Sequence, residues 1–247
     1  EPPVEHLEQR LLIDRDGTIV ARSGKVEYGQ GIRTGFARIV AEELDVPVDR
    51  VRVELGETDT TPWDMGTFGS LSTATDGAVL RAAAAFARTL LGRRASARLG
   101  VPAGTLVTRD GLVIAPDGRT VSYQDLAVGD PLAGPVPDFD PEARPIAPPA
   151  DAPSRIEAVA IVTGHARYAA DVRLPGMLRG HVLPPPVLGA HLASVDDRAA
   201  RALPGVRTIV HEGEFVGVVA DRDEQAIAAV RALEATWIPP EVGAEEP

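Results

Sequence analysis

Two glycine-bearing segments of the sequence carry residue types that can hold a ligand. The first is Gly29-Gln30-Gly31, which stands directly before residues with helical spacing. Glycine lets the backbone approach a ligand closely, and the start of a helix offers N–H groups and a positive dipole end to anions. The Gln30 amide can donate and accept hydrogen bonds at once. Taken alone, the motif fits a tight turn with a solvent-facing glutamine equally well.

The second segment, residues 66–73, places small and hydroxyl-bearing residues before another predicted helix. Its candidate ligand-binding residues are Gly69, Ser70 and Ser72. Such a loop can hydrogen-bond a phosphate or a polar heterocycle, although an ordinary helix-capping region has the same residue types. It lacks the Gly-Lys-Ser/Thr ending of a nucleotide-hydrolase phosphate loop, and its glycine spacing does not match the dinucleotide fingerprint.

Other kinds of site find little support in the sequence. No two histidines have the spacing of a helical metal-ligand pair, and the sequence contains no Gly-x-Ser-x-Gly elbow. The absence of cysteine excludes disulfides, thiol nucleophiles and iron–sulfur ligation by this chain. The histidines are His6, His165, His181, His191 and His211.

Length, composition and charge set wider limits. The 247 residues fit one large domain or two modest ones, and 44% are hydrophobic, which is enough for a core. A net charge of -11 argues against binding to nucleic acid, because neutralising phosphates needs a basic surface. No apolar run approaches the length of a membrane span, so we expect no membrane-spanning segment in this sequence.

The elements around the first segment can be predicted from spacing. Residues 11–13 and 18–21 flank an Asp/Gly turn, which is typical of a β-hairpin. Residues 34–44 have helical periodicity, and Thr34 is expected to cap this helix. Residues 51–55 alternate as in a strand.

The second segment leads into the strongest predicted helix, residues 76–91, which is rich in Ala and Leu. A further hairpin is expected around Asp110-Gly111, and residues 121–126 fit a strand end or a short capped turn. Prolines then predict an extended surface connector over residues 127–154.

The order of expected strands and helices in residues 155–247 predicts a small α+β domain. Its strands are expected at 177–183, 206–210, 215–220 and 235–238, and its helices at 195–203 and 224–233.

Together these segments resemble a known family. Residues 24–44 are similar to the Gly-Gln-Gly region of xanthine dehydrogenases and aldehyde oxidases, and Gly69-Ser70-Leu71-Ser72 with Gly77 resembles that family's next cofactor-contacting loop. Residues 163–168 and 171–178 resemble its a/b hammerhead domain. The resemblance implies an α+β chain with a partial molybdopterin-binding lobe at 1–126, the connector at 127–154 and a hammerhead at 155–247.

That family hydroxylates aldehydes or N-heterocycles with oxygen from water. The resemblance implies that Gln30 lies near molybdenum, that Gly29 and Gly31 line the pterin, and that Gly69, Ser70 and Ser72 hydrogen-bond the pterin or its phosphate. The implied cofactor is molybdopterin, expected as the molybdenum cytosine dinucleotide form and shared with a partner subunit.

The sequence departs from the family in ways that shape the expectation. The hammerhead follows the Gly-Gln-Gly region, as in the isoquinoline oxidoreductase and aldehyde dehydrogenase branch, and its usual Arg-Ser-Pro segment appears as Leu-Pro-Pro-Pro at residues 183–186. The Gly-x-Gly-Glu segment with the family's catalytic base is absent. We therefore expect no catalytic residue in this chain, and we expect it to be inactive alone, as an N-terminal portion whose other half is a separate polypeptide.

The resemblance implies two protein partners, a larger molybdopterin-binding subunit that carries the catalytic glutamate and an iron–sulfur subunit, as well as a small-molecule substrate. The cytoplasm is the expected compartment, with the periplasm as the alternative. The competing hypotheses are a non-catalytic assembly subunit of such a complex and an unrelated small-molecule binding protein.

Overall fold

The computed structural model describes residues 5–138 and 154–240. The chain forms two compact units, Glu1–Ala170 and Asp171–Pro247, which are described separately. Both mix helices with small sheets, which confirms the predicted α+β class.

The first unit is built around a three-stranded sheet with the order β1-β2-β3. After helix α1 (Leu7–Arg10), strands β1 (Leu11–Ile13) and β2 (Ile19–Ser23) form the predicted antiparallel hairpin. Strand β3 (Val51–Leu55) runs parallel to β2. Because a parallel neighbour needs a crossover, helix α2 (Ile32–Leu44) connects the two strands. The Gly29-Gln30-Gly31 turn therefore joins the end of β2 to the start of α2.

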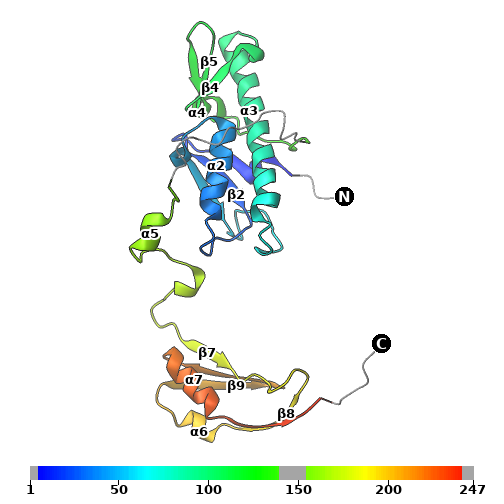
Figure 1. The fold of residues 1–247 in the computed structure, drawn as a ribbon, viewed down its shortest axis with the longest axis vertical. Helices are drawn as coiled ribbons and strands as arrows, with labels where there is room; N and C mark the ends of the chain where they lie inside the picture. The colour runs from blue at the N-terminus through cyan, green and yellow to red at the C-terminus, as the bar shows by residue number, and fades with distance from the viewer. Residues whose placement is uncertain (1–4, 139–153, 241–247) are drawn as a thin grey trace, which may run out of the picture. The chain divides into compact units, whose positions relative to one another are not determined.

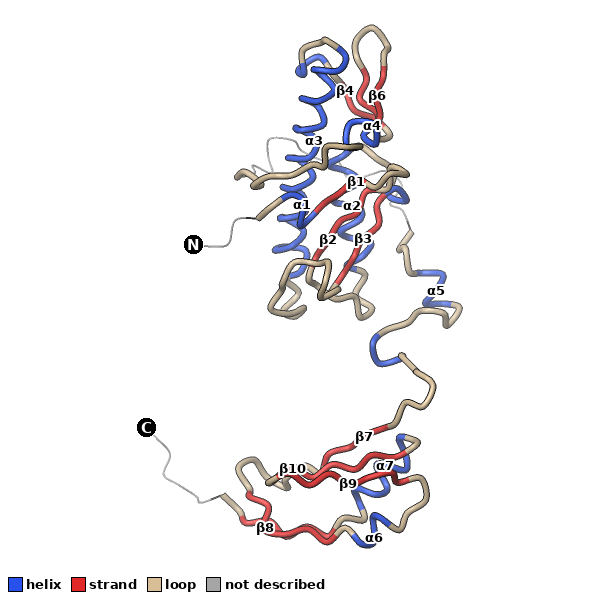
Figure 2. Tube along the Cα trace, turned by 180° about the vertical axis from the view of Figure 1, so that it is seen from behind, coloured by secondary structure: helices blue, strands red, loops and turns tan. Residues whose placement is uncertain are grey.

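Helix α3 (Ala78–Leu99) packs beside α2, and the two helices cover one face of this sheet, as the opposite views in Figures 1 and 2 show. The core between these layers contains Phe36, Leu44, Leu80 and Leu91, all fully buried. Small side chains complete it, with Ala37, Ala41, Ala83, Ala84 and Ala87 buried where the helices meet. Alanine at these positions lets the two helices approach closely.

Helix α3 is longer than the predicted segment 76–91. One turn of π-helix, Thr73–Gly77, precedes it, and it continues to Leu99 because the following residues favour helix. Gly100 ends it in the left-handed conformation, with φ 68°. The π turn is where the second candidate segment enters the helix.

A second small sheet completes the first unit. Strands β4 (Val107–Arg109) and β5 (Leu112–Ile114) form the predicted hairpin, and β6 (Thr120–Ser122) pairs with β5. Residues 121–126 become the end of β6 and helix α4 (Tyr123–Ala127), which Ser122 caps by accepting a hydrogen bond from Asp125 N. The first unit also contains short helices at 48–50 and 103–105 and helix α5 (Ala158–Val162), and a further short helix at 169–171 spans the boundary between the two units.

The second unit contains two antiparallel sheets, with the orders β7-β10-β9 and β11-β8. Its core is formed by Ala200, Ile209, Val216, Val218, Ala229 and Leu233. The predicted buried strand at 215–220 is confirmed as the central strand β10. The elements are β7 (Arg179–Val182), β8 (His191–Asp196), α6 (Arg198–Arg201), β9 (Val206–Glu212), β10 (Phe215–Ala220), α7 (Asp223–Arg231) and β11 (Glu234–Ile238).

Two local predictions are wrong. Thr34 does not cap α2: the cap is Gly31, and the Thr34 hydroxyl bonds residues 156 and 157 instead. The helix predicted at 195–203 is only α6, because its first residues complete strand β8 by pairing with β11. Pairing with a distant strand overrides local preference here.

Part of the segment 127–154, which was predicted to be an exposed extended connector, packs against the first unit instead. Leu132 is buried in the core of the first unit, and Val136 N donates to Glu5 O at 2.8 Å. Residues 139–153 of the connector lie outside the described part of the chain. Residues 155–170 fall in the first compact unit, whereas the predicted domains placed them with the second.

Candidate functional site

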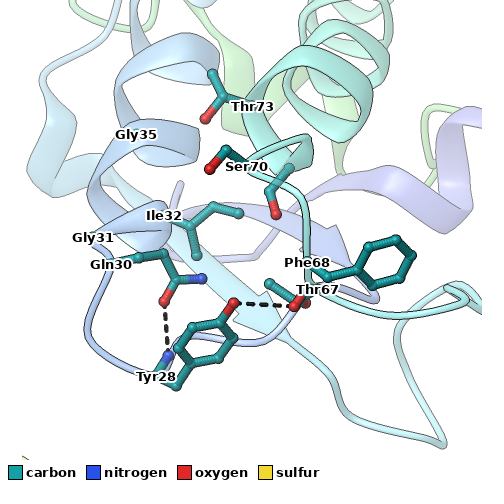
Figure 3. Close-up of a pocket in the computed structure, with 10 residues that line it drawn as sticks. Tyr28, Gln30, Gly31, Ile32, Gly35, Thr67, Phe68, Ser70 and Thr73 are labelled. Carbon is teal, nitrogen blue, oxygen red and sulfur yellow. Dashed lines mark hydrogen bonds between the residues drawn. The ribbon is translucent and has the colours of Figure 1, made fainter.

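The two glycine-bearing segments meet at one pocket of about 300 Å³ in the first unit, shown in Figure 3. Gln30 and Gly31 come from the turn before α2, and Ser70 and Ser72 come from the loop before α3. Among the described residues, no charged side chain lines this pocket. The full lining is Tyr28, Gln30, Gly31, Ile32, Gly35, Thr67, Phe68, Ser70, Ser72 and Thr73.

The pocket has the donors and acceptors that suit a neutral polar ligand. Amide, phenol and hydroxyl groups line it together with bare backbone at Gly31 and Gly35. A Cβ added at Gly35 would meet nothing within 4 Å, so the glycine leaves open space. Hydroxyls and amides both donate and accept, which allows them to match a heterocycle whose edge alternates donors and acceptors.

The Gln30 side chain is held in a fixed orientation by its own turn. Its Nε2 donates to Val26 O at 2.8 Å, and its Oε1 accepts from Tyr28 N at 2.9 Å. These two bonds assign the amide nitrogen and oxygen, because a flipped amide would face each group with the wrong partner. One N–H and one further acceptor position of the amide are left for a ligand.

Hydrogen bonds tie the two segments to one another. Val26 N donates to Thr67 Oγ1 at 2.8 Å, and the Tyr28 hydroxyl donates to Thr67 O at 3.0 Å. The two walls of the pocket are therefore cross-linked, although about 40 residues separate them in the chain.

Two ion pairs anchor the second segment and the residues on either side of it. Lys25 Nζ lies 2.9 Å from both Asp64 Oδ1 and Gly66 O, so it holds residues 64–66 against the end of β2. Asp76, in the π turn, accepts hydrogen bonds from Ser23 Oγ and from Arg10 Nη1. Since the side chains of Lys25, Ser23 and Asp76 are buried, loss of one partner would leave a polar group unsatisfied.

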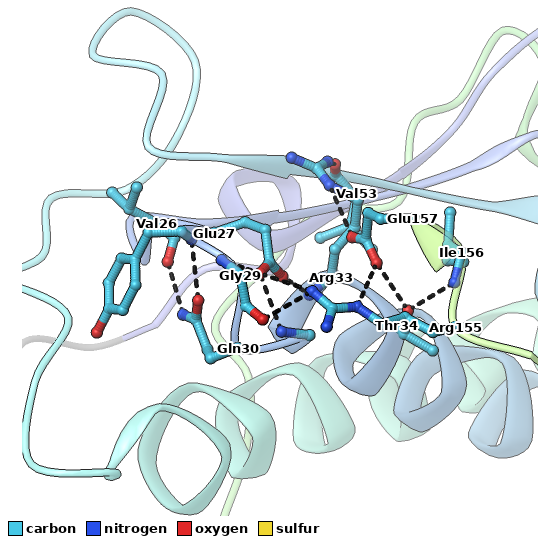
Figure 4. A network of polar contacts seen from close by, with 12 residues as sticks. Val26, Glu27, Gly29, Gln30, Arg33, Thr34, Val53, Arg155, Ile156 and Glu157 are labelled. Carbon is cyan, nitrogen blue, oxygen red and sulfur yellow. Dashed lines mark hydrogen bonds and ion pairs between the residues drawn. The ribbon is translucent and has the colours of Figure 1, made fainter. Parts of the chain in front are cut away.

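The start of α2 is occupied by a carboxylate from the chain itself, as Figure 4 shows. Glu27 Oε1 accepts from Gly29 N and Gly31 N, both at 2.9 Å, and Oε2 accepts from Arg33 N at 3.0 Å. The expectation that these amides are free to bind an external anion is therefore wrong for Gly31 and Arg33. The turn contributes Gln30 and Gly31 to the lining of the pocket.

The environment of Glu27 keeps its carboxylate charged. Burial raises the pKa of this group, but hydrogen bonds from the amides of Gly31, Arg33 and Gly29, together with the Arg155 charge, lower the pKa below its ordinary value of 4.5. At neutral pH the ionised Glu27 carboxylate is therefore an acceptor for the amides of the turn.

Four of the six predicted site residues line the pocket: Gln30, Gly31, Ser70 and Ser72. Gly29 and Gly69 stand beside it with φ angles of 117° and 64°, conformations that favour glycine. Ser70 also has a positive φ, 57°, which is uncommon for a residue with a side chain. The predicted contacts of all six residues with a cofactor remain predictions.

Several residues of the site were not singled out from the sequence. Tyr28, Thr67 and Thr73 line the pocket, and Glu27 organises the turn. Glu27 had a signal, because an acidic residue just before a predicted helix often caps it. Thr67 belongs to the hydroxyl-bearing segment 66–73, but its contact with the first segment had no signal, because it joins residues about 40 positions apart.

Within residues 5–138 and 154–240, no three His, Asp or Glu side chains gather into a group that could hold a metal ion. In the same residues, no helix is long and apolar enough to cross a membrane.

The chain is similar to known molybdenum proteins. Residues 4–135 match the model of the molybdopterin cofactor-binding domain. One subunit of the nicotinate dehydrogenase of Pseudomonas putida is 39% identical over 96% of this chain, and the beta subunit of the isoquinoline 1-oxidoreductase of Brevundimonas diminuta is 34% identical over 89%. A Cu,Mo-CO dehydrogenase structure shares 34% identity with a TM-score of 0.43, covering 47% of this chain and 15% of that one.

The chain spans only 21% and 33% of the length of the two relatives. The match to the domain model nevertheless covers both pocket-lining segments and more than half of the sequence. The chain belongs to the molybdopterin cofactor-binding domain family, within the xanthine dehydrogenase family of molybdopterin-binding subunits.

Proposed function

We propose that this chain forms part of a molybdenum hydroxylase that oxidises an N-heterocycle or an aldehyde, and that the pocket between its two glycine-bearing segments holds part of the molybdopterin. In such a reaction water supplies the oxygen, and each C–H converted to C–OH releases two electrons and two protons. The two relatives named for nicotinate and isoquinoline favour an N-heterocycle, because both names denote such compounds.

The observation that carries the proposal is the shared pocket of Gln30 and Ser70. A pterin is a flat heterocycle with several donors and acceptors on its edge, and a lining of amide, phenol and hydroxyl groups fits it. The pocket lacks carboxylates among the described residues, so nothing there repels the phosphate of the cofactor. The residues present therefore fit the group.

The residues of this chain would bind and orient the cofactor. Gln30, Ser70, Ser72 and Thr73 would donate to or accept from its edge, and Gly31 and Gly35 would let the backbone approach it. When bound, the molybdenum would supply the redox chemistry by taking electrons from the substrate. A prearranged set of donors would also stabilise charge that develops near the metal.

The finer features of the assembly belong to the same proposal. The cofactor is expected as the cytosine dinucleotide form, the catalytic glutamate on a larger molybdopterin-binding subunit and the iron–sulfur clusters on another chain. The cytoplasm is the proposed compartment, with the periplasm as the alternative. Mass spectrometry of the purified assembly and of its released cofactor tests the cofactor and its partners.

The Gln30→Ala variant tests the role of this pocket. We expect the complex to assemble as in the wild type and kcat/KM to fall about 10²-fold, as when one preorganised donor is lost. Gln9→Ala is the matched control, because Gln9 is an exposed glutamine on α1 outside the pocket. Molybdenum and pterin content are measured on the same preparations. A wild-type assembly without molybdenum or pterin would end the proposal.

A second candidate function is assembly without a direct role at the cofactor. The loop before α3 exposes large apolar side chains, with Trp63 86% and Met65 72% accessible, and Phe68 and Leu71 about half exposed. Such a patch is typical of a surface that another polypeptide covers. An assembly role would be favoured if Gln30→Ala left turnover unchanged while Trp63→Ser released this chain from the complex.

A further inference from the structure

A short segment far along the chain contacts the Gly29-Gln30-Gly31 turn from outside the pocket. Arg155 Nη2 donates to Gly29 O at 2.9 Å, across 126 positions of the sequence, and lies 3.5 Å from Glu27 Oε1 (Figure 4). Arg155 therefore binds both a carbonyl of the turn and the carboxylate that gathers the amides of the turn.

The two residues after Arg155 fasten it to the first turn of α2. Ile156 N donates to Thr34 Oγ1 at 2.9 Å, and the Thr34 hydroxyl donates to Glu157 Oε2 at 3.2 Å. Glu157 also pairs with Arg33 at 3.5 Å and with Arg155 at 3.4 Å. Backbone and side-chain contacts thus fix where the Arg155 guanidinium lies.

The turn needs such external support. Gly29 and Gly31 both have positive φ, and glycine loses more conformational freedom on ordering than any other residue. Two of the amides that Glu27 binds belong to these glycines. A charge-assisted contact to the same carboxylate strengthens that arrangement, since bonds to ionised groups are stronger than neutral ones.

Neither Glu27 nor Arg155 is among the residues that line the pocket. Gln30, between the two held glycines, does line it. Fixing the backbone on both sides of Gln30 therefore fixes where its amide faces the pocket. Arg155 also lies outside residues 4–135, the part of the chain that matches the cofactor-binding domain model.

We infer that Arg155 is a positioning residue: acting with Glu27, it holds the Gly29-Gln30-Gly31 turn and thereby orients Gln30 toward the ligand in the pocket. The part of this inference that concerns molybdopterin rests on the proposed function. The effect of Arg155 on the turn is independent of the proposed function, because the contacts lie within this chain.

The test uses the full chain, first alone and then in its assembly. Hydrogen exchange with mass spectrometry measures the protection of the amides of residues 27–33 in wild type, Arg155→Ala and Arg155→Lys. We expect about tenfold faster exchange at these amides in Arg155→Ala, from loss of one charge-assisted bond. Arg155→Lys should be intermediate, because lysine keeps the charge but not the planar fork.

Two further variants sharpen the comparison. Arg50→Ala is the matched control, because Arg50 Nη2 donates to the carbonyl of another positive-φ glycine, Gly17, at 3.2 Å. It should leave residues 27–33 unchanged. Thr34→Val is nearly isosteric, yet it removes the hydroxyl that accepts from Ile156 N, so it should reproduce part of the Arg155→Ala effect.

In the assembly, kcat per bound molybdenum should fall about tenfold in Arg155→Ala and recover in part in Arg155→Lys, while KM changes little, because the substrate contacts are kept.

Unchanged exchange at residues 27–33 in Arg155→Ala would overturn the inference, as would faster exchange spread evenly over the chain. Faster exchange at the turn with unchanged kcat per molybdenum would overturn the role toward Gln30. A wild-type assembly without molybdenum or pterin defeats only the proposed function, since the exchange result stands alone.

Discussion

At the scale of single residues, Glu27 links the candidate site to pH. Its carboxylate accepts three backbone N–H groups and pairs with Arg155 at 3.5 Å. The folded-state pKa is lowered below 4.5, so Glu27 stabilises the fold above its unfolded pKa. That contribution is lost as the pH falls through the folded pKa.

The Glu27→Gln variant should therefore be less stable than the wild type at neutral pH, by about 1 to 3 kcal/mol, because an amide cannot replace all the acceptor positions of the carboxylate. The difference should shrink as the pH falls below 4.5 and through the lowered pKa of folded Glu27, because the wild-type carboxylate then becomes protonated in the folded state as well. Urea unfolding followed by far-UV circular dichroism at several pH values measures this. Glu212→Gln, at an exposed position of β9, should show no such trend; a constant difference at all pH values would refute the assignment.

At the scale of elements, the site depends on how closely the loop after β3 approaches the end of β2. A Cβ added at Gly24 would lie 2.4 Å from Pro62 O and 2.5 Å from Asp64 Cβ, which backbone and side chain cannot accommodate without moving. That loop continues to Thr67, which bonds Val26 and lines the pocket. The close approach at Gly24 therefore sets the position of one wall of the pocket.

Two glycine-to-alanine substitutions should consequently change the free energy of unfolding in opposite directions. Gly24→Ala should destabilise the chain by about 1 to 3 kcal/mol through overpacking. Gly92→Ala should stabilise it by about 0.5 to 1 kcal/mol, because Gly92 lies within α3 and its Cβ would meet nothing within 4 Å. Chemical denaturation measures both. Equal stability of the two variants would show that the contact at Gly24 yields without cost.

At the scale of the whole molecule, charge decides which partners the chain can meet. The net charge of -11 gives an acidic surface, so any anionic ligand must be bound by local N–H and O–H groups. In a gel mobility-shift assay at low salt, where electrostatic binding is strongest, the chain should not retard a DNA fragment. Salt-sensitive binding to DNA would contradict the role inferred from the acidic composition.

The sequence by itself determined the local elements and the family. Asp-Gly turns between apolar runs specify both hairpins, and helical periodicity specifies α2 and α3, because these signals depend on neighbours within a few residues. The residues that carry the family resemblance, in segments between Gly24 and Leu178, could likewise be identified without coordinates. Local chemistry, namely which backbone angles and caps a residue allows, follows from the order of the residues.

Only the tertiary structure decided that Gln30 and Ser70 share one pocket, that Glu27 occupies the start of α2, and that Arg155 reaches Gly29. It also showed that part of a segment predicted as helix belongs to strand β8, which pairs with β11. Each of these depends on groups that are far apart in sequence and meet only when the chain closes. Their free energies depend on burial and on partners, and neither property belongs to a residue type alone.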